Sequence, residues 1–412
     1  MTTGLLILTI FAVGFAMVAK RLATTIVTPP MAFLGLGFLL SHFGLFSQAE
    51  AESILHVVAE VALVILLFLD AAQTDLQALR QRHIWPARML LVGLTLSVGL
   101  GTLVAWLLLP TWPLIAAALV AAILAPTDAA LGQAVVTNSI VPARARRALT
   151  VESGLNDGLA LPIVLLFASL SAEVMSQDTS DWLQFAAMQV LLGPLAGAAI
   201  GTAGGFVLLR AKRHCLTSEA FEGVGAIALA GTGYLAATAI GGNGFISAFV
   251  AGLCFGNVVK GQCKFIYEFT ESEGLLLTWG AFFVLGLALV PQALGHLSWP
   301  VLAVILSSLF IVRPLAIWLS LIGTDASNTT RLFFGWFGPR GLATALFALL
   351  VVPKVSHVLA EPVLMLAVNT VWISALLHGL TANLGAKWYA ARVDAMGPSA
   401  ETQPIQDSAP PT

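Results

Sequence analysis

A short polar segment in the middle of the chain carries side chains that can bind a cation. Residues 152–158 read Glu-Ser-Gly-Leu-Asn-Asp-Gly. In a helix, Ser153 and Asp157 lie one turn apart on one face. Glu152 and Asn156 share the adjoining stripe. Because hard cations prefer oxygen ligands, the segment predicts a site for Na+ or a similar monovalent cation, with Asp157 as its charged ligand.

Two other polar segments predict interruptions in apolar helices. Pro126 precedes Thr127 and Asp128 in one apolar run, and a proline inside a helix removes a backbone hydrogen bond and clashes with the preceding turn. Residues 337–341, Phe-Gly-Pro-Arg-Gly, predict a second interruption for the same reason. Helix ends freed in this way carry partial charges. Asp128 and Arg340, each beside an interruption, are therefore placed to neutralise them.

Oxygen atoms from these segments could together coordinate the cation. Asp157 and Ser153 would supply side-chain oxygens, and the interruption at Thr127 would supply released backbone carbonyls. Asp70, at the end of another apolar run, is a further candidate ligand. An ionisable side chain inside a membrane is costly, so each of these charged residues is a functional candidate.

Two arginines, Arg313 and Arg340, lie inside apolar runs without acidic neighbours there. A buried arginine needs a partner. We expect Glu152 to pair with one of them, while Asn156 donates a hydrogen bond. The sequence leaves open which arginine is the partner. A bridge that only holds the fold together is the alternative interpretation of Glu152 and Arg340.

The elements that must position these side chains are membrane-spanning helices. The 412-residue chain is 58% hydrophobic and only 10% charged, whereas ordinary globular proteins carry about 25% charged residues. Apolar runs of roughly 20 residues, long enough to cross a bilayer, recur throughout. We predict an all-α polytopic membrane protein with about thirteen spans, at 4–19, 26–46, 54–72, 88–109, 112–137, 148–171, 183–210, 218–240, 243–259, 272–294, 299–322, 330–352 and 361–391.

The same composition excludes several classes of protein. A soluble enzyme is excluded by the shortage of polar surface. The net charge of -2 provides no basic field for nucleic acid, and the three cysteines form neither a zinc spacing nor an even disulfide set. We therefore expect no cofactor and no nucleic-acid partner.

The basic residues indicate how the chain is oriented. Lys and Arg gather in every second loop, beginning with Lys20 and Arg21. The positive-inside rule then places the N-terminus outside and the C-terminus in the cytoplasm of a cell membrane. Residues 1–392 form one transmembrane transporter domain. From 393 to 412 the chain turns polar and contains prolines, which predicts a disordered cytoplasmic tail.

The two interruptions fall in the fifth and twelfth spans, seven apart. Two inverted six-helix repeats, spans one to six and eight to thirteen, would place the broken helices in corresponding positions that cross at the midplane. Such paired interruptions point to the ion site of a transporter. For Pro126 alone, a simple kink is the alternative.

At these residues the chain resembles the monovalent cation:proton antiporter family. The similarity is to its electroneutral branch, which contains NhaP-type bacterial Na+/H+ antiporters and the sodium/hydrogen exchangers. It is carried by residues 127–128, 152–157, 338–341, 313–314 and 68–70. The resemblance implies core helices moving against dimerisation helices, alternating access and a homodimer.

The resemblance also implies roles for individual residues. Asp157 would bind the cation and the proton, with Ser153, Thr127 and Asp70 near the cation. Asn156 replaces the first aspartate of the pair found in electrogenic relatives, which implies one-for-one exchange. Family members often carry Glu at the position of Asp70.

We therefore predict a secondary antiporter, not an enzyme, that exchanges Na+, or Li+ or K+, for H+. The alternatives are a K+/H+ antiporter and a cation-coupled organic-solute symporter. A channel would need a continuous polar pore. An intramembrane hydrolase would need Asp128 and Asp157 to share a proton, and the accompanying arginines suit charge compensation better.

Overall fold

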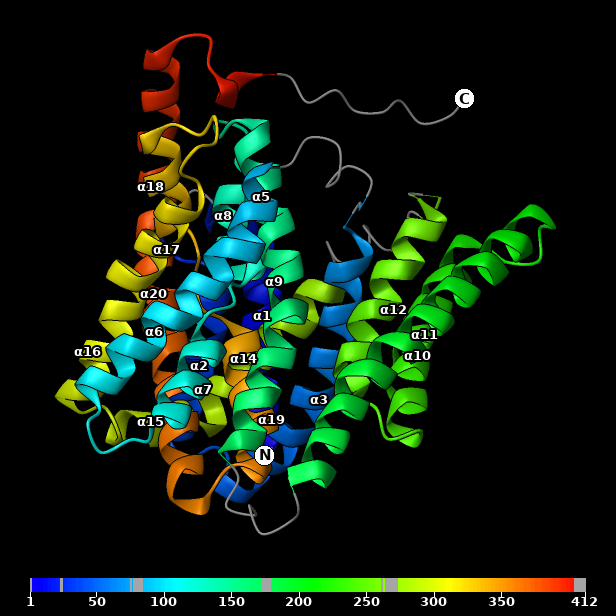
Figure 1. The fold of residues 1–412 in the computed structure, drawn as a ribbon, viewed down its shortest axis with the longest axis horizontal. Helices are drawn as coiled ribbons and strands as arrows, with labels where there is room; N and C mark the ends of the chain where they lie inside the picture. The colour runs from blue at the N-terminus through cyan, green and yellow to red at the C-terminus, as the bar shows by residue number, and fades with distance from the viewer. Residues whose placement is uncertain are drawn as a thin grey trace.

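A computed structural model of the protein describes residues 2–22, 25–74, 76, 84–171, 179–260, 262–263 and 273–403. Within these residues every regular element is a helix (Figure 1). The elements are α1 (Thr2–Leu22), α2 (Pro29–His42), α3 (Gln48–Ala72), α5 (Ile84–Arg88), η1 (Met89–Gly93), α6 (Leu94–Leu108), α7 (Leu114–Leu124), α8 (Ala129–Val136), α9 (Ala143–Leu170), α10 (Thr179–Arg213), α11 (Glu219–Ala239), α12 (Gly244–Val259), α14 (Glu273–Ala288), α15 (Val290–Gly295), α16 (Trp299–Ser307), η2 (Ser308–Val312), α17 (Arg313–Ser320), α18 (Asn328–Trp336), α19 (Leu342–Val351), η3 (Val352–Lys354), α20 (His357–Met396) and η4 (Ala400–Thr402).

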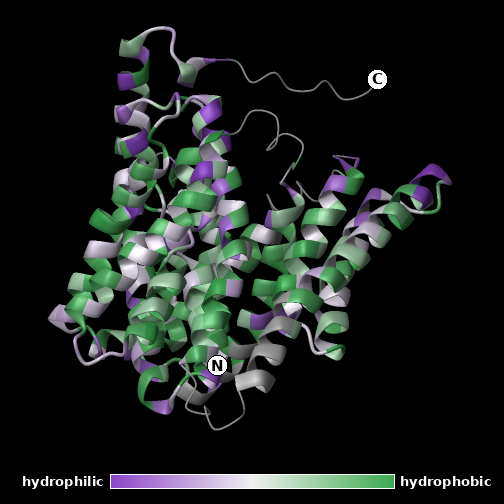
Figure 2. Ribbon diagram, viewed as in Figure 1, coloured by the Kyte–Doolittle hydropathy of each residue, from purple (hydrophilic) through white to green (hydrophobic). Residues whose placement is uncertain are grey.

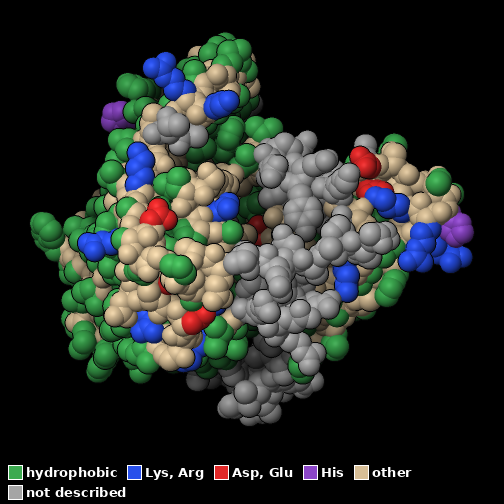
Figure 3. Space-filling view, turned by 90° about the horizontal axis from the view of Figure 1, so that it is seen from above, with side chains coloured by type: hydrophobic (Ala, Val, Ile, Leu, Met, Phe, Trp, Pro, Cys, Tyr) green, Lys and Arg blue, Asp and Glu red, His purple; other side chains and the backbone are tan. Residues whose placement is uncertain are grey.

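The helices form an all-α membrane protein. Six helical segments in the described residues are long and apolar enough to cross a membrane: Thr2–Leu22, Ile84–Leu108, Ala143–Leu170, Leu191–Arg213, Trp299–Ser320 and His357–Met396. Apolar residues cover the middle of the helices, and hydrophilic residues gather toward the end where the C-terminus lies (Figure 2). Lys and Arg side chains lie around that same end when it is viewed from above (Figure 3). Interrupted helices such as α7, with 11 residues, are too short to cross alone.

Both predicted interruptions are present. The apolar run that contains Pro126 divides into α7, which ends at Leu124, and α8, which begins at Ala129. The second run divides into α18, which ends at Trp336, and α19, which begins at Leu342. Residues 125–128 and 337–341 are the two breaks.

The helix that precedes each broken helix contains a π-helical segment. In the first case η1 separates α5 from α6, and in the second η2 separates α16 from α17. A π-helical segment inserts an extra residue into a turn and often occurs at a functional site. Arg313 is the first residue after η2, so this segment determines the face on which the arginine points.

Two helix pairs pack at backbone-to-backbone distance through glycine. In the pair α2 and α14, a Cβ at Gly37 would collide with the Phe283 carbonyl, and one at Gly286 would collide with the Leu34 carbonyl. In the pair α3 and α12, Gly252 lies against the backbone of α3 in the same way. Small residues allow membrane helices to approach closely enough for strong van der Waals contact.

The C-terminal part of the chain is helical beyond the boundary expected at residue 393. Helix α20 continues to Met396, and residues 400–402 form a 3-10 turn that packs against the start of α18. The continuation is explained by burial, because Val393 is 1% exposed and belongs to the apolar cluster around Tyr389. The rest of the expected tail, from 404 to 412, lies outside the described residues.

Candidate cation-binding site

The carboxylate of Asp128 links the two breaks. One of its oxygens accepts hydrogen bonds from the backbone N–H groups of Ala130 (2.7 Å) and Leu131 (3.1 Å), at the start of α8. The other accepts from the N–H of Leu342 (2.7 Å), at the start of α19. The Asp128 N–H in turn donates to the Pro339 carbonyl at 2.9 Å. One carboxylate thus caps the positive ends of two half-helices, whereas the sequence placed Asp128 only beside its own break.

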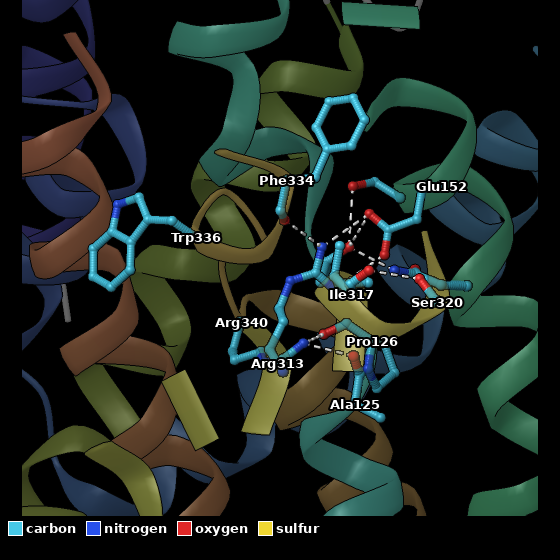
Figure 4. A network of polar contacts seen from close by, with 12 residues as sticks. Ala125, Pro126, Glu152, Arg313, Ile317, Ser320, Phe334, Trp336 and Arg340 are labelled. Carbon is cyan, nitrogen blue, oxygen red and sulfur yellow. Dashed lines mark hydrogen bonds and ion pairs between the residues drawn. The ribbon is translucent and has the colours of Figure 1, made fainter. Parts of the chain in front are cut away.

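Arg340 caps the opposite kind of helix end. Its guanidinium donates to the carbonyls of Ala125 (2.6 Å) and Pro126 (2.9 Å), which follow the last turn of α7 (Figure 4). The side chain is buried, at 1% exposed. A cation at a helix C-terminus compensates the partial negative charge of its free carbonyls. The neutralising role predicted for Arg340 therefore has a clear geometric basis.

Glu152 pairs with Arg313, which answers the question that the sequence leaves open. The two side chains form a bidentate bridge, with N–O distances of 3.0 and 3.1 Å (Figure 4). Both are buried, and Arg313 also donates to the Phe334 carbonyl at 3.4 Å. Bidentate pairing fixes both groups in one geometry. Arg340 bonds backbone carbonyls instead, so the alternative pairing of Glu152 with Arg340 does not form.

Thr127 is the centre of the polar contacts between the first break and α9. Its hydroxyl lies 3.3 Å from Glu152 Oε2 and 3.2 Å from Ser153 Oγ. The Asn156 amide also donates to it, which is the hydrogen bond expected of Asn156. These contacts bring three residues of one α9 turn against the break. All four side chains are buried.

Asp157 differs from the charged residues around it. Its Oδ1 atom is buried and has no hydrogen-bond partner among the residues that the structure describes. Asp70, Asp128 and Glu152 lie close enough to act on it electrostatically. Leaving a buried oxygen without a partner costs free energy, more so for a charged group. This unpartnered oxygen lies one helical turn from Ser153 on α9.

Asp70 lies near the end of α3, where that helix meets α9. Gly154, inside the polar segment of α9, faces the Asp70 carbonyl, because a Cβ there would lie 3.3 Å from that oxygen. The Thr74 hydroxyl donates to the same carbonyl at 3.3 Å. The structure thus brings the end of α3 to the residues that the sequence selects on α9. No group of three or more His, Cys, Asp or Glu side chains in the described part converges as a metal site.

A sequence profile of known proteins matches this chain over residues 6–388, and that family is described as "Sodium/hydrogen exchanger, transmembrane". The chain belongs to the sodium/hydrogen exchanger family. Its members are secondary transporters, not enzymes. The resemblance seen in the sequence motifs is confirmed.

Characterised relatives of this exchanger-family chain are similar over most of its length. The K+/H+ antiporter NhaP of Alkalimonas amylolytica is 28% identical over 409 residues, which is 97% of this chain and 70% of the relative. The K+/H+ antiporter NhaP2 of Shewanella sp. (strain ANA-3) is 29% identical over 382 residues, which is 90% of this chain and 63% of the relative. This chain thus spans roughly two thirds of their lengths.

The fold is that of a solved antiporter. The sodium proton antiporter MjNhaP1 of Methanocaldococcus jannaschii superposes with a TM-score of 0.77 and 20% sequence identity, over 94% of this chain and 99% of that one. At this identity the likeness concerns the fold.

The sequence alone did not indicate two polar residues that contact the second break. Ser374 accepts a hydrogen bond from the Arg340 N–H at 2.7 Å, and His378 lies 2.9 Å from the Trp336 carbonyl. Both are on α20 and are buried. Their signal in the sequence is polar residues at positions i and i+4 of an otherwise apolar span.

Proposed function

We propose that the protein exchanges Na+ for H+ across a membrane, with Asp157 binding either the cation or the proton. The observation that carries the proposal is the open, buried Oδ1 atom of Asp157 beside a helix break. Ser153 and Thr127 add hydroxyl oxygens at that place, and Asp70 is a further candidate ligand. Oxygen ligands suit a hard monovalent cation.

Exchange follows from the character of this single carboxylate. In a low-dielectric site it cannot stay charged without a counter-ion, so either a cation or a proton must accompany it. The two occupants exclude each other, and each transport direction carries one positive charge. The exchange is therefore electroneutral, and a membrane potential leaves its equilibrium unchanged.

The other charges at the site remain constant during this cycle. Glu152 is held by Arg313, and Asp128 is held by three backbone N–H donors. Asn156 is neutral and donates to Thr127. These contacts support a role for all of them, with Arg340, as a scaffold that keeps the ligand position open.

Alternating access is proposed on the basis of thirteen spans arranged as two inverted six-helix repeats. Its support is that α5, η1 and α6 precede the break at 125–128, as α16, η2 and α17 precede the break at 337–341. We further propose a homodimer in the cell membrane with a cytoplasmic C-terminus. The basic side chains around the C-terminal end (Figure 3) favour that orientation.

K+ is the second candidate cation, because the relatives NhaP and NhaP2 are K+/H+ antiporters. The test is a pH-sensitive dye in proteoliposomes, with Na+, Li+ and K+ added one at a time and no organic solute. Saturable proton flux with Na+ supports the proposal, and flux with K+ alone selects the second candidate. Proton flux that requires an organic solute would show instead that the protein is a symporter.

A further inference from the structure

A polar pair on α20 holds the second break. Ser374 and His378, one turn apart, are 0% and 2% exposed in a helix that is otherwise mostly apolar. The Ser374 hydroxyl accepts from the backbone N–H of Arg340 at 2.7 Å. The His378 Nε2 atom lies 2.9 Å from the carbonyl of Trp336, the last residue of α18. The pair therefore contacts the chain on both sides of Phe337.

The plane of the imidazole is fixed by stacking. Its ring lies over the Trp336 indole with centroids 5.0 Å apart and an interplanar angle of 23°. The indole N–H is itself held, since it donates to the Thr381 hydroxyl at 3.1 Å. With the ring plane set, each ring nitrogen faces one fixed environment.

The bond to the second break requires a hydrogen on Nε2, because the Trp336 carbonyl can only accept. Nδ1 lies 2.9 Å from the Ser374 carbonyl and 3.1 Å from the Ser374 hydroxyl. That hydroxyl already accepts from the Arg340 N–H, so its own hydrogen can be donated to Nδ1. Both Nδ1 contacts stay within α20, so it is the Nε2–H that joins His378 to the second break.

The charges nearby favour a neutral ring. Arg340 and Arg313 both act on His378 electrostatically, and Glu152 is already engaged by Arg313. An imidazolium would add a third positive charge to this region.

This network reaches the cation site through Arg340. The same residue whose N–H is anchored on Ser374 extends its guanidinium to the Ala125 and Pro126 carbonyls at the first break. The position of its backbone therefore determines which carbonyls next to Thr127 are covered and which remain free. A displacement of the second break would change the ligands offered to the cation.

The geometry points to Ser374 and His378 as positioning residues for cation binding. His378, through its Nε2–H, and Ser374 together hold residues 336–340, and thereby hold Arg340 over the end of α7. The inference deepens the proposed function and rests on it for the identity of the transported ion. The hydrogen-bond chain itself, from Arg340 through Ser374 and His378 to Trp336, is independent of that function.

Transport kinetics test the positioning role. His378→Leu removes the donor to the Trp336 carbonyl, and Ser374→Ala removes the acceptor of the Arg340 N–H, so we expect the KM for the cation to rise about three- to tenfold in each variant. His378→Gln retains an N–H donor for the Trp336 carbonyl and should restore the KM to within about twofold of wild type. Thr370→Val is the matched control, since the Thr370 hydroxyl bonds only the Leu366 carbonyl of its own helix. An unchanged KM in His378→Leu would overturn the positioning role. An equal rise in KM in His378→Leu and His378→Gln would overturn it as well.

The tautomer is tested without any transport. In protein labelled with 15N-histidine, the signal that disappears in His378→Gln belongs to this ring. We expect a protonated Nε2 at neutral pH, because only an N–H can bond the Trp336 carbonyl. An unprotonated Nε2 would overturn the proposed positioning role. If the wild-type protein exchanged none of the tested cations, the proposed function would fail while this spectroscopic result still stood.

Discussion

At the scale of single residues, several charged groups inside the helix bundle are paired with one another or with helix ends, and Asp157 Oδ1 is the one buried carboxylate oxygen in the described residues without a hydrogen-bond partner. Glu152 and Arg313 form a bidentate pair, and Asp128 and Arg340 cap helix ends. Removing one partner of such a buried pair costs about 3–5 kcal/mol, because the other charge is left uncompensated. Asp157 has a buried oxygen without a partner in the described structure, so its removal should affect transport more than folding.

Replacing Asp157 by Asn tests its role as the shared ligand. The substitution keeps the size of the side chain but removes the group that binds a proton or a cation in turn. We expect cation-dependent proton flux to fall to the level of empty liposomes, with expression unchanged. Asp394→Asn, at an exposed site near the end of α20, is the control and should leave flux intact. Undiminished flux in Asp157→Asn would remove this residue from the mechanism.

Replacing Asn156 by Asp tests what sets the charge balance. The variant places a second carboxylate beside Asp157 and removes the amide donor to Thr127. If the added carboxylate takes part in the cycle, each turnover moves net charge, and a potential contributes about 2.3 kcal/mol per charge per 100 mV. We expect the equilibrium of exchange in proteoliposomes to shift with an imposed potential. Transport that stays insensitive to voltage would show that Asn156 does not determine electroneutrality.

At the scale of helices, the breaks depend on rigid neighbours. The two breaks contact each other, because Asp128 bonds half-helices from both. A contact of this kind keeps its geometry only if the helices around it resist displacement. The glycine-mediated pairs, α2 with α14 and α3 with α12, provide such contacts at backbone distance.

Two glycines of α14 allow a matched test of this packing. A Cβ at Gly286 would collide with the Leu34 carbonyl of α2, whereas a Cβ at Gly280 would meet nothing within 4 Å. Gly286→Ala should therefore lower the thermal stability of the purified protein, by roughly 1–3 kcal/mol for an overpacked contact. Gly280→Ala should leave the thermal stability unchanged or slightly higher than that of the wild type, since Ala is the better helix former by about 1 kcal/mol. Equal effects of the two substitutions would contradict the close approach.

At the scale of the whole molecule, the C-terminal turn ties several helices together. The Glu401 carboxylate accepts from the Thr330 hydroxyl (2.7 Å) and the Ser327 N–H (3.0 Å) at the start of α18. Arg144, near the start of α9, donates to the Ala400 carbonyl at 2.7 Å. The turn therefore bridges the helix that carries Asp157 and the helix that leads into the second break.

The pH dependence of this contact follows from Glu401. Burial alone would raise the pKa of its carboxyl, but the hydrogen bonds from Thr330 and Ser327 outweigh it and hold that pKa below its usual value. The charged form therefore adds stability above the usual glutamate pKa of about 4.3. That stability is lost as the pH falls through the lowered value.

Glu401→Gln should accordingly destabilise the protein at neutral pH. The loss is on the order of 1 kcal/mol for a weakened charge-assisted contact. The difference in melting temperature between wild type and variant should narrow in acid, once the wild-type carboxyl is protonated. Asp394→Asn, at an exposed position near the end of α20, serves as the control. A difference that stays constant down to acid pH would show that the charge of Glu401 is not involved.

The sequence by itself determined the features that depend on local geometry. A proline next to polar residues in an apolar run favours a helix break, so the breaks near Pro126 and at 337–341 were predictable. Proline alone is not sufficient, because Pro162, Pro194 and Pro362 lie inside α9, α10 and α20. Helical periodicity likewise placed Ser153 and Asp157 on one face. Hydropathy determined the class of protein, because a chain with so little polar surface can be stable only in a bilayer.

Only the tertiary structure decided which distant groups meet. Arg313 and Arg340 look alike in the sequence, because each is an arginine inside an apolar run. Their different partners depend on how α17 and the second break lie against α9 and α7. The contacts of Ser374 and His378 with the second break likewise depend on how α20 packs against it. Spacing along one helix specifies a face, but the position of another helix across that face is set by packing of the whole bundle. Pair contacts between elements far apart in the chain therefore had to be read from the fold.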